Sequence, residues 1–288
     1  VGPMVGASDL AFRLLCRRHG VDVCYTEMLF SRRLVDDPTY RERKLRSCAA
    51  DRPLIVQLQG NDPGELAAAA TVVASHVACD ALDLNLGCPL PQACEALFGS
   101  YLLDREHWPR VCAIVRAMVA AAPHLAICAK VRLLPCADDL VTLCGLLAEA
   151  GCSLVCIHGR HRPARGQHRG ERSRQPADLE AIRQVVEALP HLRILCNGNT
   201  QAPADVGRNL AYTGAHGLVS AEGVLRNPLR FEGGGEGGAG GEGGEGRGEG
   251  GEGRGLSREK LSRVTLEYLS LARTHMPEDM SVVRGHVM

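Results

Sequence analysis

The chain lacks a long hydrophobic run, an excess of charge of either sign and any closely paired cysteine motif. A membrane-spanning helix needs roughly 18–20 consecutive apolar residues, and the longest candidate, residues 111–122, is interrupted by Arg116. The 33 basic and 33 acidic side chains give a formal net charge of zero. These absences argue against a membrane protein and against a global basic field that would attract nucleic acid.

The start of the sequence shows no initiating methionine, basic n-region or apolar h-region, so we expect no secretory leader. The 13 cysteines are odd in number, lie in apolar segments and include no CxxC pair. This usage indicates neither a zinc ribbon nor a disulfide framework. We therefore expect a protein that is not secreted, in which most cysteines are small buried side chains in a reducing compartment.

Residues 232–255 contain no aliphatic side chain larger than alanine and cannot build a core. Without this Gly/Glu tract, 31 basic and 27 acidic side chains remain, so the neutral total hides a mildly basic folded part. We interpret the tract as a disordered insert, either a flexible linker or an artefact of the gene model.

Short β-rich apolar runs alternate with amphipathic helical patterns over the rest of the chain. The runs that predict strands are 21–26, 54–58, 81–85, 127–131, 154–158, 194–197 and 217–219, and a further strand is expected to be cut short before Pro3. The helical patterns are 9–19, 63–76, 108–121, 138–150, 178–188 and 202–212. Alternation predicts a parallel sheet covered by helices. Eight such units predict a closed α/β fold, the (β/α)8 TIM barrel, and no GxGxxG follows the first strand to favour an open dinucleotide-binding sheet.

Functional residues of such a barrel lie at the carboxyl ends of the strands and in the loops that follow. Polar residues stand at seven of these positions, which packing alone explains poorly. They are Thr26-Glu27, Gln57-Leu58-Gln59, Asp83 with Asn85, Lys130-Val131-Arg132, His158-Gly159-Arg160, Asn197-Gly198-Asn199 and Ser220-Ala221-Glu222.

Each of these residues also has a simpler interpretation. A hydrogen-bonded amide in the core would also account for Gln57. Lys130 fits either a Schiff-base lysine or a cation that binds a ligand. His158 taken alone suits a hydrogen-bonded core imidazole, and no second histidine or carboxylate stands at metal-ligand spacing, so we predict no metal site. Glycine-containing loops after the last two strands commonly bind phosphate in barrels, which favours a phosphorylated cofactor.

Cys88 differs from the other cysteines because it lies between Gly87 and Pro89, just past a predicted strand. A thiol with a pKa near 8.5 is mostly protonated at neutral pH and can act as a general acid. A nucleophilic role is the alternative, but it needs a base and an oxyanion hole, and only His158 stands out as a base.

The segment Asn85-Leu86-Gly87-Cys88-Pro89 resembles the signature of the tRNA-dihydrouridine synthases. Other motifs follow in family order: Pro3-Met4-Val5, Tyr25-Thr26-Glu27-Met28, Gln57-Leu58-Gln59-Gly60, Lys130-Val131-Arg132, His158-Gly159-Arg160 and Asn197-Gly198-Asn199. Ser220-Ala221-Glu222-Gly223 is similar to the branch that acts on uridines 16 and 17 of tRNA. The resemblance covers residues 1 to about 232 and resumes weakly over 256–288.

The resemblance implies an FMN-dependent barrel at residues 1–231, the insert at 232–255, and a truncated helical tRNA-binding domain at 256–288. It implies that reduced FMN gives hydride to uracil C6, that Cys88 protonates C5, and that NADPH or NADH restores the flavin. It implies FMN contacts from Pro3, Met4, Val5, Gln57, Lys130, His158, Asn197, Gly198, Asn199, Ala221 and Glu222. Asn85, Arg132 and Arg160 would bind the substrate.

The implied partner is tRNA, with no membrane, for a monomer in the cytoplasm and, as an alternative, the nucleus. Arginines at 160, 162, 165, 169, 172 and 174 would offer a basic rim for tRNA phosphates, although a solvated loop explains them as well. Two other functions stay open. One is an FMN barrel acting on a small pyrimidine, like a dihydroorotate dehydrogenase, and the other is an inactive RNA-binding paralogue.

Overall fold

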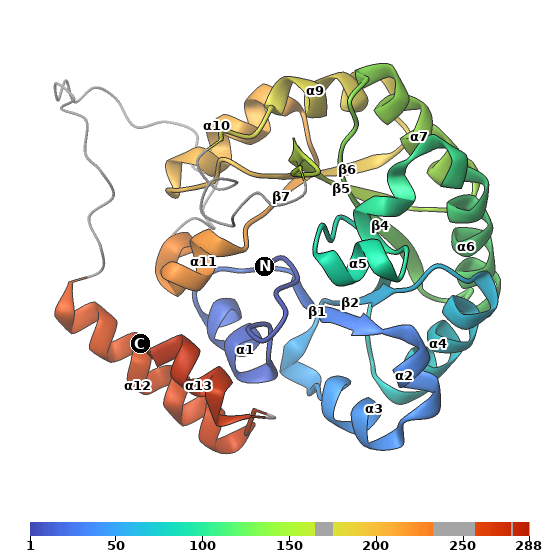
Figure 1. The fold of residues 1–288 in the computed structure, drawn as a ribbon. Helices are drawn as coiled ribbons and strands as arrows, with labels where there is room; N and C mark the ends of the chain where they lie inside the picture. The colour runs from blue at the N-terminus through green and yellow to red at the C-terminus, as the bar shows by residue number, and fades with distance from the viewer. Residues whose placement is uncertain (165–174, 233–256, 278, 288) are drawn as a thin grey trace, which may run out of the picture.

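Seven parallel strands form one curled sheet in a computed structural model that describes residues 1–164, 175–232, 257–277 and 279–287 (Figure 1). Spatial order follows sequence order from β1 to β7, as in an α/β TIM barrel. The strands are β1 Cys24–Phe30, β2 Leu54–Gln59, β3 Ala81–Leu86, β4 Ala126–Leu133, β5 Leu154–His161, β6 Arg193–Asn197 and β7 Gly217–Val219. All seven predicted strands are confirmed, and only the first is displaced, because the apolar residues Met28–Phe30 extend it toward its carboxyl end.

Residues 1 and 2 join the two edges of the curled sheet. The carbonyl of Val1 accepts from the backbone N–H of Tyr25 on β1 at 3.0 Å. The N–H of Gly2 donates to the carbonyl of Ser220, just after β7, at 2.8 Å. The first residues therefore stand where the remaining strand of a closed barrel pairs with both of its neighbours.

A bulge interrupts the pairing of β1 with β2. Tyr25 pairs with Ile55 and Met28 pairs with Gln57, so β1 has one more residue than β2 over this stretch. The hydroxyl of Thr26 accepts from the backbone N–H of Gln57 at 3.1 Å, which satisfies a donor that the bulge leaves unpaired.

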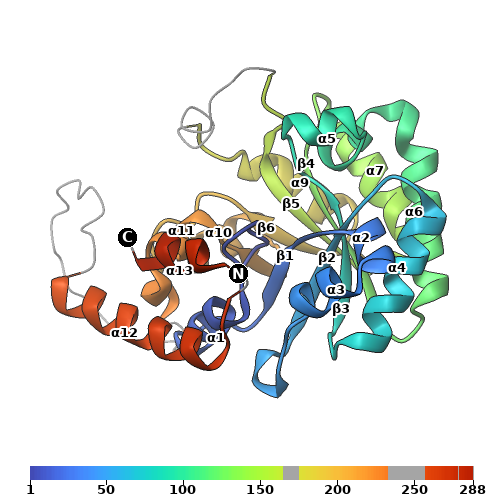
Figure 2. The ribbon, with the colours of Figure 1, turned by 60° about the horizontal axis from the view of Figure 1, so that its bottom comes forward.

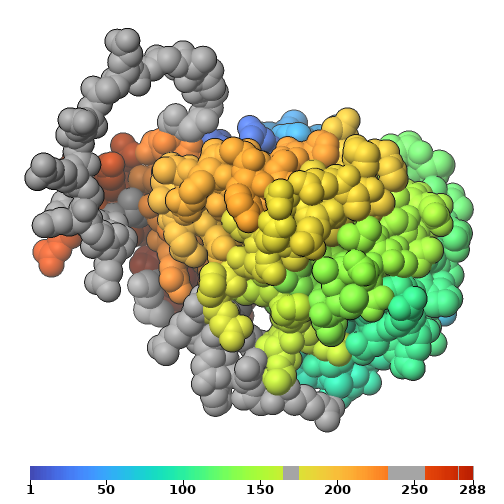
Figure 3. Space-filling view, turned by 90° about the horizontal axis from the view of Figure 1, so that it is seen from above, coloured from blue at the N-terminus to red at the C-terminus, as the bar shows by residue number. Residues whose placement is uncertain are grey.

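Helices surround the sheet. Those of the barrel are α1 Leu10–Arg18, α2 Ser31–Asp36, α3 Pro38–Lys44, α4 Pro63–His76, α5 Pro91–Glu95, α6 Trp108–Ala121, α7 Ala137–Glu149, α9 Leu179–Ala188, α10 Ala204–Thr213 and α11 Glu222–Arg226. Short 3-10 turns occupy η1 Ala49–Asp51, η2 Gly99–Leu103, η3 Arg105–His107 and η4 Pro228–Phe231. The predicted bounds of α4 and α6 are confirmed, and the other four predicted helices lie within two residues of their predicted bounds. Figure 3 shows α9 and α10, in yellow and orange, on the outer surface.

The start of α4 shows how a local signal sets a boundary. Asp62 accepts a hydrogen bond from the N–H of Glu65 at 2.8 Å, and Pro63 fills the first helical position. Both features stabilise a helix start, because the first turn has free N–H groups and proline has none to offer. In contrast, α2, α3, α5 and α11 were not predicted, because five to seven residues are too few for an amphipathic period.

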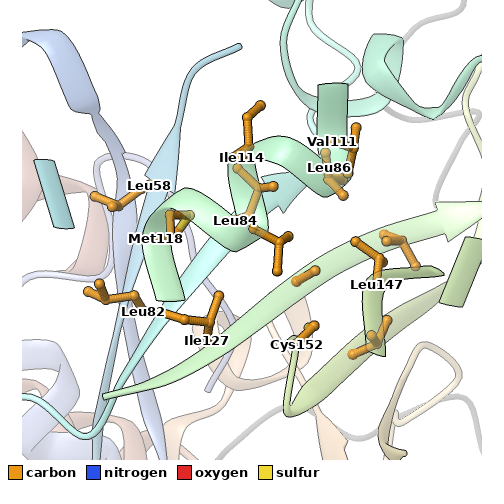
Figure 4. Close-up of a cluster of buried hydrophobic side chains, with 14 of the residues drawn as sticks. Leu58, Leu82, Leu84, Leu86, Val111, Ile114, Met118, Ile127, Leu147 and Cys152 are labelled. Atoms are coloured by element: carbon orange, nitrogen blue, oxygen red, sulfur yellow. The ribbon is translucent and has the colours of Figure 1, made fainter. Parts of the chain in front are cut away.

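The main hydrophobic core lies between the outer face of the sheet and the helices. Alternate residues of a strand point to opposite faces of the sheet. On β3, the residues that face outward into the main core are Leu82, Leu84 and Leu86. They pack with Ile114 and Met118 of α6, as Figure 4 shows.

The inner face of the same strands changes character along the barrel axis. Near the amino ends of the strands, Tyr25, Ile55, Ala81 and Cys128 form a small apolar cluster. Toward the carboxyl ends, the inward positions are polar. The barrel interior is therefore closed by apolar side chains at one end and lined by polar ones at the other.

Two further helices, α12 Arg258–Thr274 and α13 Met280–Val287, pack beside α1 (Figures 1 and 2). The ring of His286 stacks on Phe12 with centroids 4.5 Å apart, and its Nε2 lies 3.0 Å from Asp9. Tyr268 and Leu271 of α12 complete the apolar contact. Apart from Glu232, the predicted Gly/Glu insert falls outside the described residues.

Candidate functional site

The strand register gathers the predicted residues at the carboxyl end of the barrel. Asn85 on β3 pairs with Lys130 on β4, and Arg132 on β4 pairs with His158 on β5. His158 in turn pairs with Asn197 on β6. All five side chains belong to the inward-facing set of their strands, so the sequence prediction that they converge is confirmed by the register.

Lys130 is half-buried and is held by the amide of Asn197. Its Nζ donates to Oδ1 of Asn197 at 2.8 Å. The Nδ2 of Asn197 donates to the carbonyl of Val219 on β7 at 2.7 Å. The cation is thus fixed at one place inside the barrel mouth, and its ammonium group has further protons to donate.

His158 is a neutral imidazole surrounded by cations. Burial together with the nearby charges of Lys130, Arg132 and Arg160 lowers the pKa of His158 to about 2. The guanidinium of Arg160 lies 3.2 Å from Nε2 of His158. Because that guanidinium can only donate, Nε2 is the acceptor and the ring proton sits on Nδ1.

Gln57 lies deeper in the barrel than its neighbours and is fully buried. Its Nε2 donates to Oδ2 of Asp83 at 2.8 Å, and its Oε1 accepts from Nδ2 of Asn85 at 2.7 Å. Full burial means that direct contact with a bound molecule would require a neighbouring side chain to move.

Asp83, one of the polar residues expected at the strand ends but given no role there, also belongs to this network. Its carboxyl group is fully buried, and burial raises its pKa to about 7, while the hydrogen bond from Gln57 and the charge of Lys130 act in the opposite sense. Its position two residues before Asn85 on one strand was the available signal, because such residues share a face.

The backbone of Cys88 is held from both sides. Its N–H donates to Oδ1 of Asn85 at 3.0 Å, and its carbonyl accepts from both the N–H and the hydroxyl of Ser100, each at 3.0 Å. Gly99 has a φ of +63°, and a Cβ there would meet the carbonyl oxygen of Cys88 at 2.7 Å. The chain after β3 is thereby fixed at the barrel mouth, close to α5 (Figure 2).

The thiol of Cys88 is a protonated group at neutral pH. Burial raises its pKa above the ordinary value, although a backbone hydrogen bond from Leu90 and the charge of Arg132 lower it in part. The side chain packs with Met28, Ala93 and Phe98. A protonated thiol suits proton donation better than nucleophilic attack, which needs the thiolate.

Arg132 joins the strand β4 to the Cys88 loop. Its Nε donates to the carbonyl of Gly87 at 2.7 Å, and one terminal nitrogen lies 3.3 Å from the carbonyl of His161. A guanidinium beside a protonated thiol can hold the carbonyl groups of a planar ring.

Pro3, Met4 and Val5 lead into a tight turn over residues 4–7, beside the end of β7. The N–H of Met4 donates to the hydroxyl of Ser8 at 2.9 Å, and its carbonyl accepts from the N–H groups of Ala7 and Ser8. Val5 is 66% exposed, so it is open to a ligand rather than part of the core.

The loop after β6 is built around Gly198 and Asn199. Asn199, at a φ of +54°, exchanges two hydrogen bonds of 2.7 Å with the backbone of Ala177. Gly198 has a φ of +132°, and a Cβ there would lie 2.5 Å from that of Ala177. Ala221 is half-buried and Glu222 is exposed at the start of α11, where the charge of Glu222 acts on Arg160.

The predicted arginine rim is only partly described. Arg160 donates from Nε to the carbonyl of Gln175 at 2.7 Å. Arg162 forms an ion pair with Asp104 at 3.0 Å and donates to the carbonyl of Ser100 at 2.8 Å. Arg165, Arg169, Arg172 and Arg174 lie outside the described residues.

Over the described ranges, no helix is long and apolar enough to cross a bilayer. In the same parts of the chain, no three His, Cys, Asp or Glu side chains cluster in a way that could hold a metal ion.

Comparison with known proteins gives a consistent result. The family model for dihydrouridine synthase (Dus) matches residues 1–236. A tRNA-dihydrouridine(16/17) synthase-like protein of Mus musculus, whose name includes NAD(P)(+), is 36% identical over 291 residues, 100% of this chain and 54% of that protein. The tRNA-dihydrouridine(16/17) synthase of Schizosaccharomyces pombe is 36% identical over 234 residues, 80% of this chain and 56% of that protein.

A tRNA-dihydrouridine(20a/20b) synthase-like protein of Homo sapiens is 30% identical over 240 residues, 80% of this chain and 69% of that protein. Among solved structures, a DHODH from Eimeria tenella in complex with ferulenol aligns with a TM-score of 0.48 and 12% identity, covering 70% of this chain and 60% of that one. The chain spans about half the length of the first curated relatives that it matches.

Proposed function

Because the chain belongs to the dihydrouridine synthase family, we propose that it reduces specific uridines of tRNA to 5,6-dihydrouridine. Bound FMN, re-reduced by NADPH or NADH, would supply the hydride for C6 of uracil. The names of the relatives support the nicotinamide, and the two 36% identical relatives support uridines 16 and 17 as targets.

One observation carries this proposal within the site. Cys88 has its peptide fixed on both sides, by Asn85 and Ser100, at the polar end of the barrel, and its thiol has a raised pKa. A group that delivers a proton must be protonated beforehand and held within reach of the acceptor atom. Cys88 meets the first condition and is positioned by its neighbours, so we assign it the proton for C5.

The donor set at the barrel mouth fits FMN. Lys130 is a cation held in place by Asn197, and a cation beside the polar edge of the isoalloxazine favours the anionic reduced form. His158 offers a neutral ring, and fully buried Gln57 would contact this edge of the flavin once a neighbouring side chain moves. Gly198 and Asn199 with Ala221 and Glu222 would bind the phosphate, while Pro3, Met4 and Val5 would contact the flavin through the backbone.

Asn85 and Arg132 are assigned to the uracil ring. Both already bind the backbone of the Cys88 loop, Asn85 through Oδ1 and Arg132 through Nε. Each therefore couples the position of the ring to the position of the thiol. The uridine must leave its stack to enter the site.

The remaining assignments concern the RNA. Arg160 and the arginines after it would contact tRNA phosphates. We keep the predicted division into a barrel at 1–231, an insert at 232–255 and the start of a helical tRNA-binding domain at 256–288. A monomer acting on tRNA in the cytoplasm or nucleus is the corresponding cellular expectation.

The test uses the purified chain with FMN, either NADPH or NADH, and an unmodified tRNA transcript. Nucleoside mass spectrometry should detect dihydrouridine with the wild type and with Cys94→Ala, which changes a half-buried cysteine of the nearby helix α5, but not with Cys88→Ala. Turnover of a free pyrimidine in place of tRNA would contradict the proposal, and so would flavin-loaded protein that leaves tRNA unmodified.

A further inference from the structure

A chain of hydrogen bonds runs from the barrel interior to the Cys88 loop. Asp83 accepts from Gln57 at 2.8 Å, Gln57 accepts from Asn85 at 2.7 Å, and Asn85 accepts from the N–H of Cys88 at 3.0 Å and of Gly87 at 3.2 Å. Gln57 and Asp83 are fully buried and Asn85 is 7% exposed.

The direction of every bond in this chain follows from its two ends. A backbone N–H only donates, so Asn85 must turn Oδ1 toward Gly87 and Cys88 and Nδ2 toward Gln57. Gln57 must then present Oε1 to Asn85, which leaves its Nε2 facing Asp83. Only an acceptor at position 83 satisfies that donor, and a carboxyl oxygen is such an acceptor.

Packing alone does not account for an acid at this place. The second oxygen of Asp83, Oδ1, is buried without a hydrogen-bond partner among the described residues. Burying a polar atom without a partner is costly, and an apolar side chain of similar volume would avoid that cost. A residue that carries this penalty is best explained by the one bond that it does make, to Gln57.

We propose that Asp83 is a positioning residue that fixes the amide of Gln57 and, through Asn85, the backbone that carries Cys88. Asp83 affects catalysis only through these neighbours, and this effect on catalysis rests on the proposed function. Its effect on the Cys88 loop does not, because the hydrogen bonds are present in the chain itself.

The test measures the rate at which iodoacetamide alkylates Cys88, followed by peptide mass spectrometry on the full chain. Asp83→Leu leaves the buried amide of Gln57 without an acceptor and weakens the support of the loop, so the alkylation rate of Cys88 should rise about fivefold or more. Asp83→Asn keeps an acceptor oxygen and should stay within about twofold of the wild type. Exposed Cys136 and buried Cys144 are the reference thiols in the same samples.

Two further variants separate positioning from general destabilisation. Leu84→Ala removes an outward core side chain from the same strand, and it should not raise the Cys88 rate more than the Cys144 rate. Asp83→Leu should add no further increase to Gln57→Leu, because both break the same chain of bonds.

Equal changes at Cys88 and Cys144 in Asp83→Leu, or no change at Cys88, would overturn the proposal. A failure of Asp83→Asn to restore the wild-type rate would overturn it as well. Dihydrouridine formation is measured in parallel, with kcat expected to fall more than KM rises in Asp83→Leu. If the wild type forms no dihydrouridine, the proposed function fails while the alkylation result still decides the role of Asp83.

Discussion

Lys130 on β4 donates a hydrogen bond to Asn197 on β6 at 2.8 Å, although β5 lies between the two strands in the sheet. The bond crosses the interior of the barrel, which is possible because both side chains point inward near the carboxyl ends of their strands. It places a fixed positive charge at the centre of the candidate site.

Replacing this cation should weaken FMN binding. Lys130→Met keeps most of the side-chain volume but removes the charge and the donor to Asn197. Because a charge-assisted hydrogen bond contributes about 1.5–3 kcal/mol, the dissociation constant for FMN should rise about tenfold or more. Titration of the apoprotein, followed by flavin fluorescence, measures it. Lys260→Met on the exposed side of α12 is the matched control, and equal affinities for both variants would remove Lys130 from the site.

Removing the thiol of Cys88 should abolish proton delivery without disturbing the fold. A positioned general acid accelerates a reaction about 10²–10⁴-fold, so Cys88→Ala should lower the single-turnover rate of uridine reduction by a factor in that range. Flavin affinity should change little, because the thiol packs against Met28 and Phe98. A rate close to that of Cys94→Ala would show that another group supplies the proton.

His158 should stay neutral throughout the physiological pH range, since its pKa is lowered to about 2. The pKa of a histidine in an unfolded chain is about 6.5. Below that pH the unfolded state binds a proton at this side chain, whereas His158 in the folded state stays unprotonated. The contribution of His158 to stability is therefore complete above about pH 6.5 and is lost as the pH falls. Nitrogen NMR shifts of the ring should not change between pH 8 and pH 5, and a titration in that interval would contradict this assignment.

Asp83 should act on stability in the opposite sense. Its pKa is raised to about 7 by burial, and the groups that face it are Lys130, Tyr25 and the thiols of Cys128, Cys152 and Cys156. Among them only Lys130 is charged in this range. The contribution of protonated Asp83 to the stability of the folded state is complete below about pH 4 and is lost as the pH rises through about 7.

Urea unfolding of the wild type and of Asp83→Asn tests this pH dependence. The free energy of unfolding of the variant, relative to the wild type, should increase from pH 4 to pH 8. A difference that does not change with pH would mean that Asp83 is ionised in both states.

The sequence predicts the barrel well because its signals are local. Each strand is a short apolar run, and Asp62 with Pro63 marks the start of α4 in the sequence itself. The register then brings Lys130, His158 and Asn197 together, because inward positions alternate along parallel strands. These are consequences of strand geometry that need no knowledge of side-chain contacts.

The contacts that hold Cys88 could not be predicted in the same way. Ser100 binds the carbonyl of Cys88 from twelve residues away, and Arg162 binds the carbonyl of Ser100 across 62 residues. Such pairs depend on how loops cross above the barrel, and loops carry no period that reveals their partners. No role could be assigned to Asp83 from the sequence, because its raised pKa comes from burial, and burial is a property of the fold.

Gly99 lies directly against the backbone of Cys88. Gly99 has a φ of +63°, and an added Cβ would lie 2.7 Å from the carbonyl oxygen and 2.9 Å from the Cβ of Cys88. Both atoms belong to a part of the chain that Asn85 and Ser100 already hold, so the loop can relieve the clash only by giving up those hydrogen bonds. Gly99→Ala should therefore lower the free energy of unfolding by about 1–3 kcal/mol and slow uridine reduction.

Gly207→Ala is the control for this substitution, because Gly207 lies in α10 and an added Cβ meets nothing within 4 Å. Alanine is favoured over glycine inside a helix by about 1 kcal/mol, so this variant should be as stable as the wild type or more stable, with unchanged activity. Urea unfolding and the iodoacetamide rate of Cys88 measure both variants. If Gly99→Ala behaved like Gly207→Ala in both assays, the Cys88 loop would be free to shift, and its fixed position could not be what presents the thiol to its substrate.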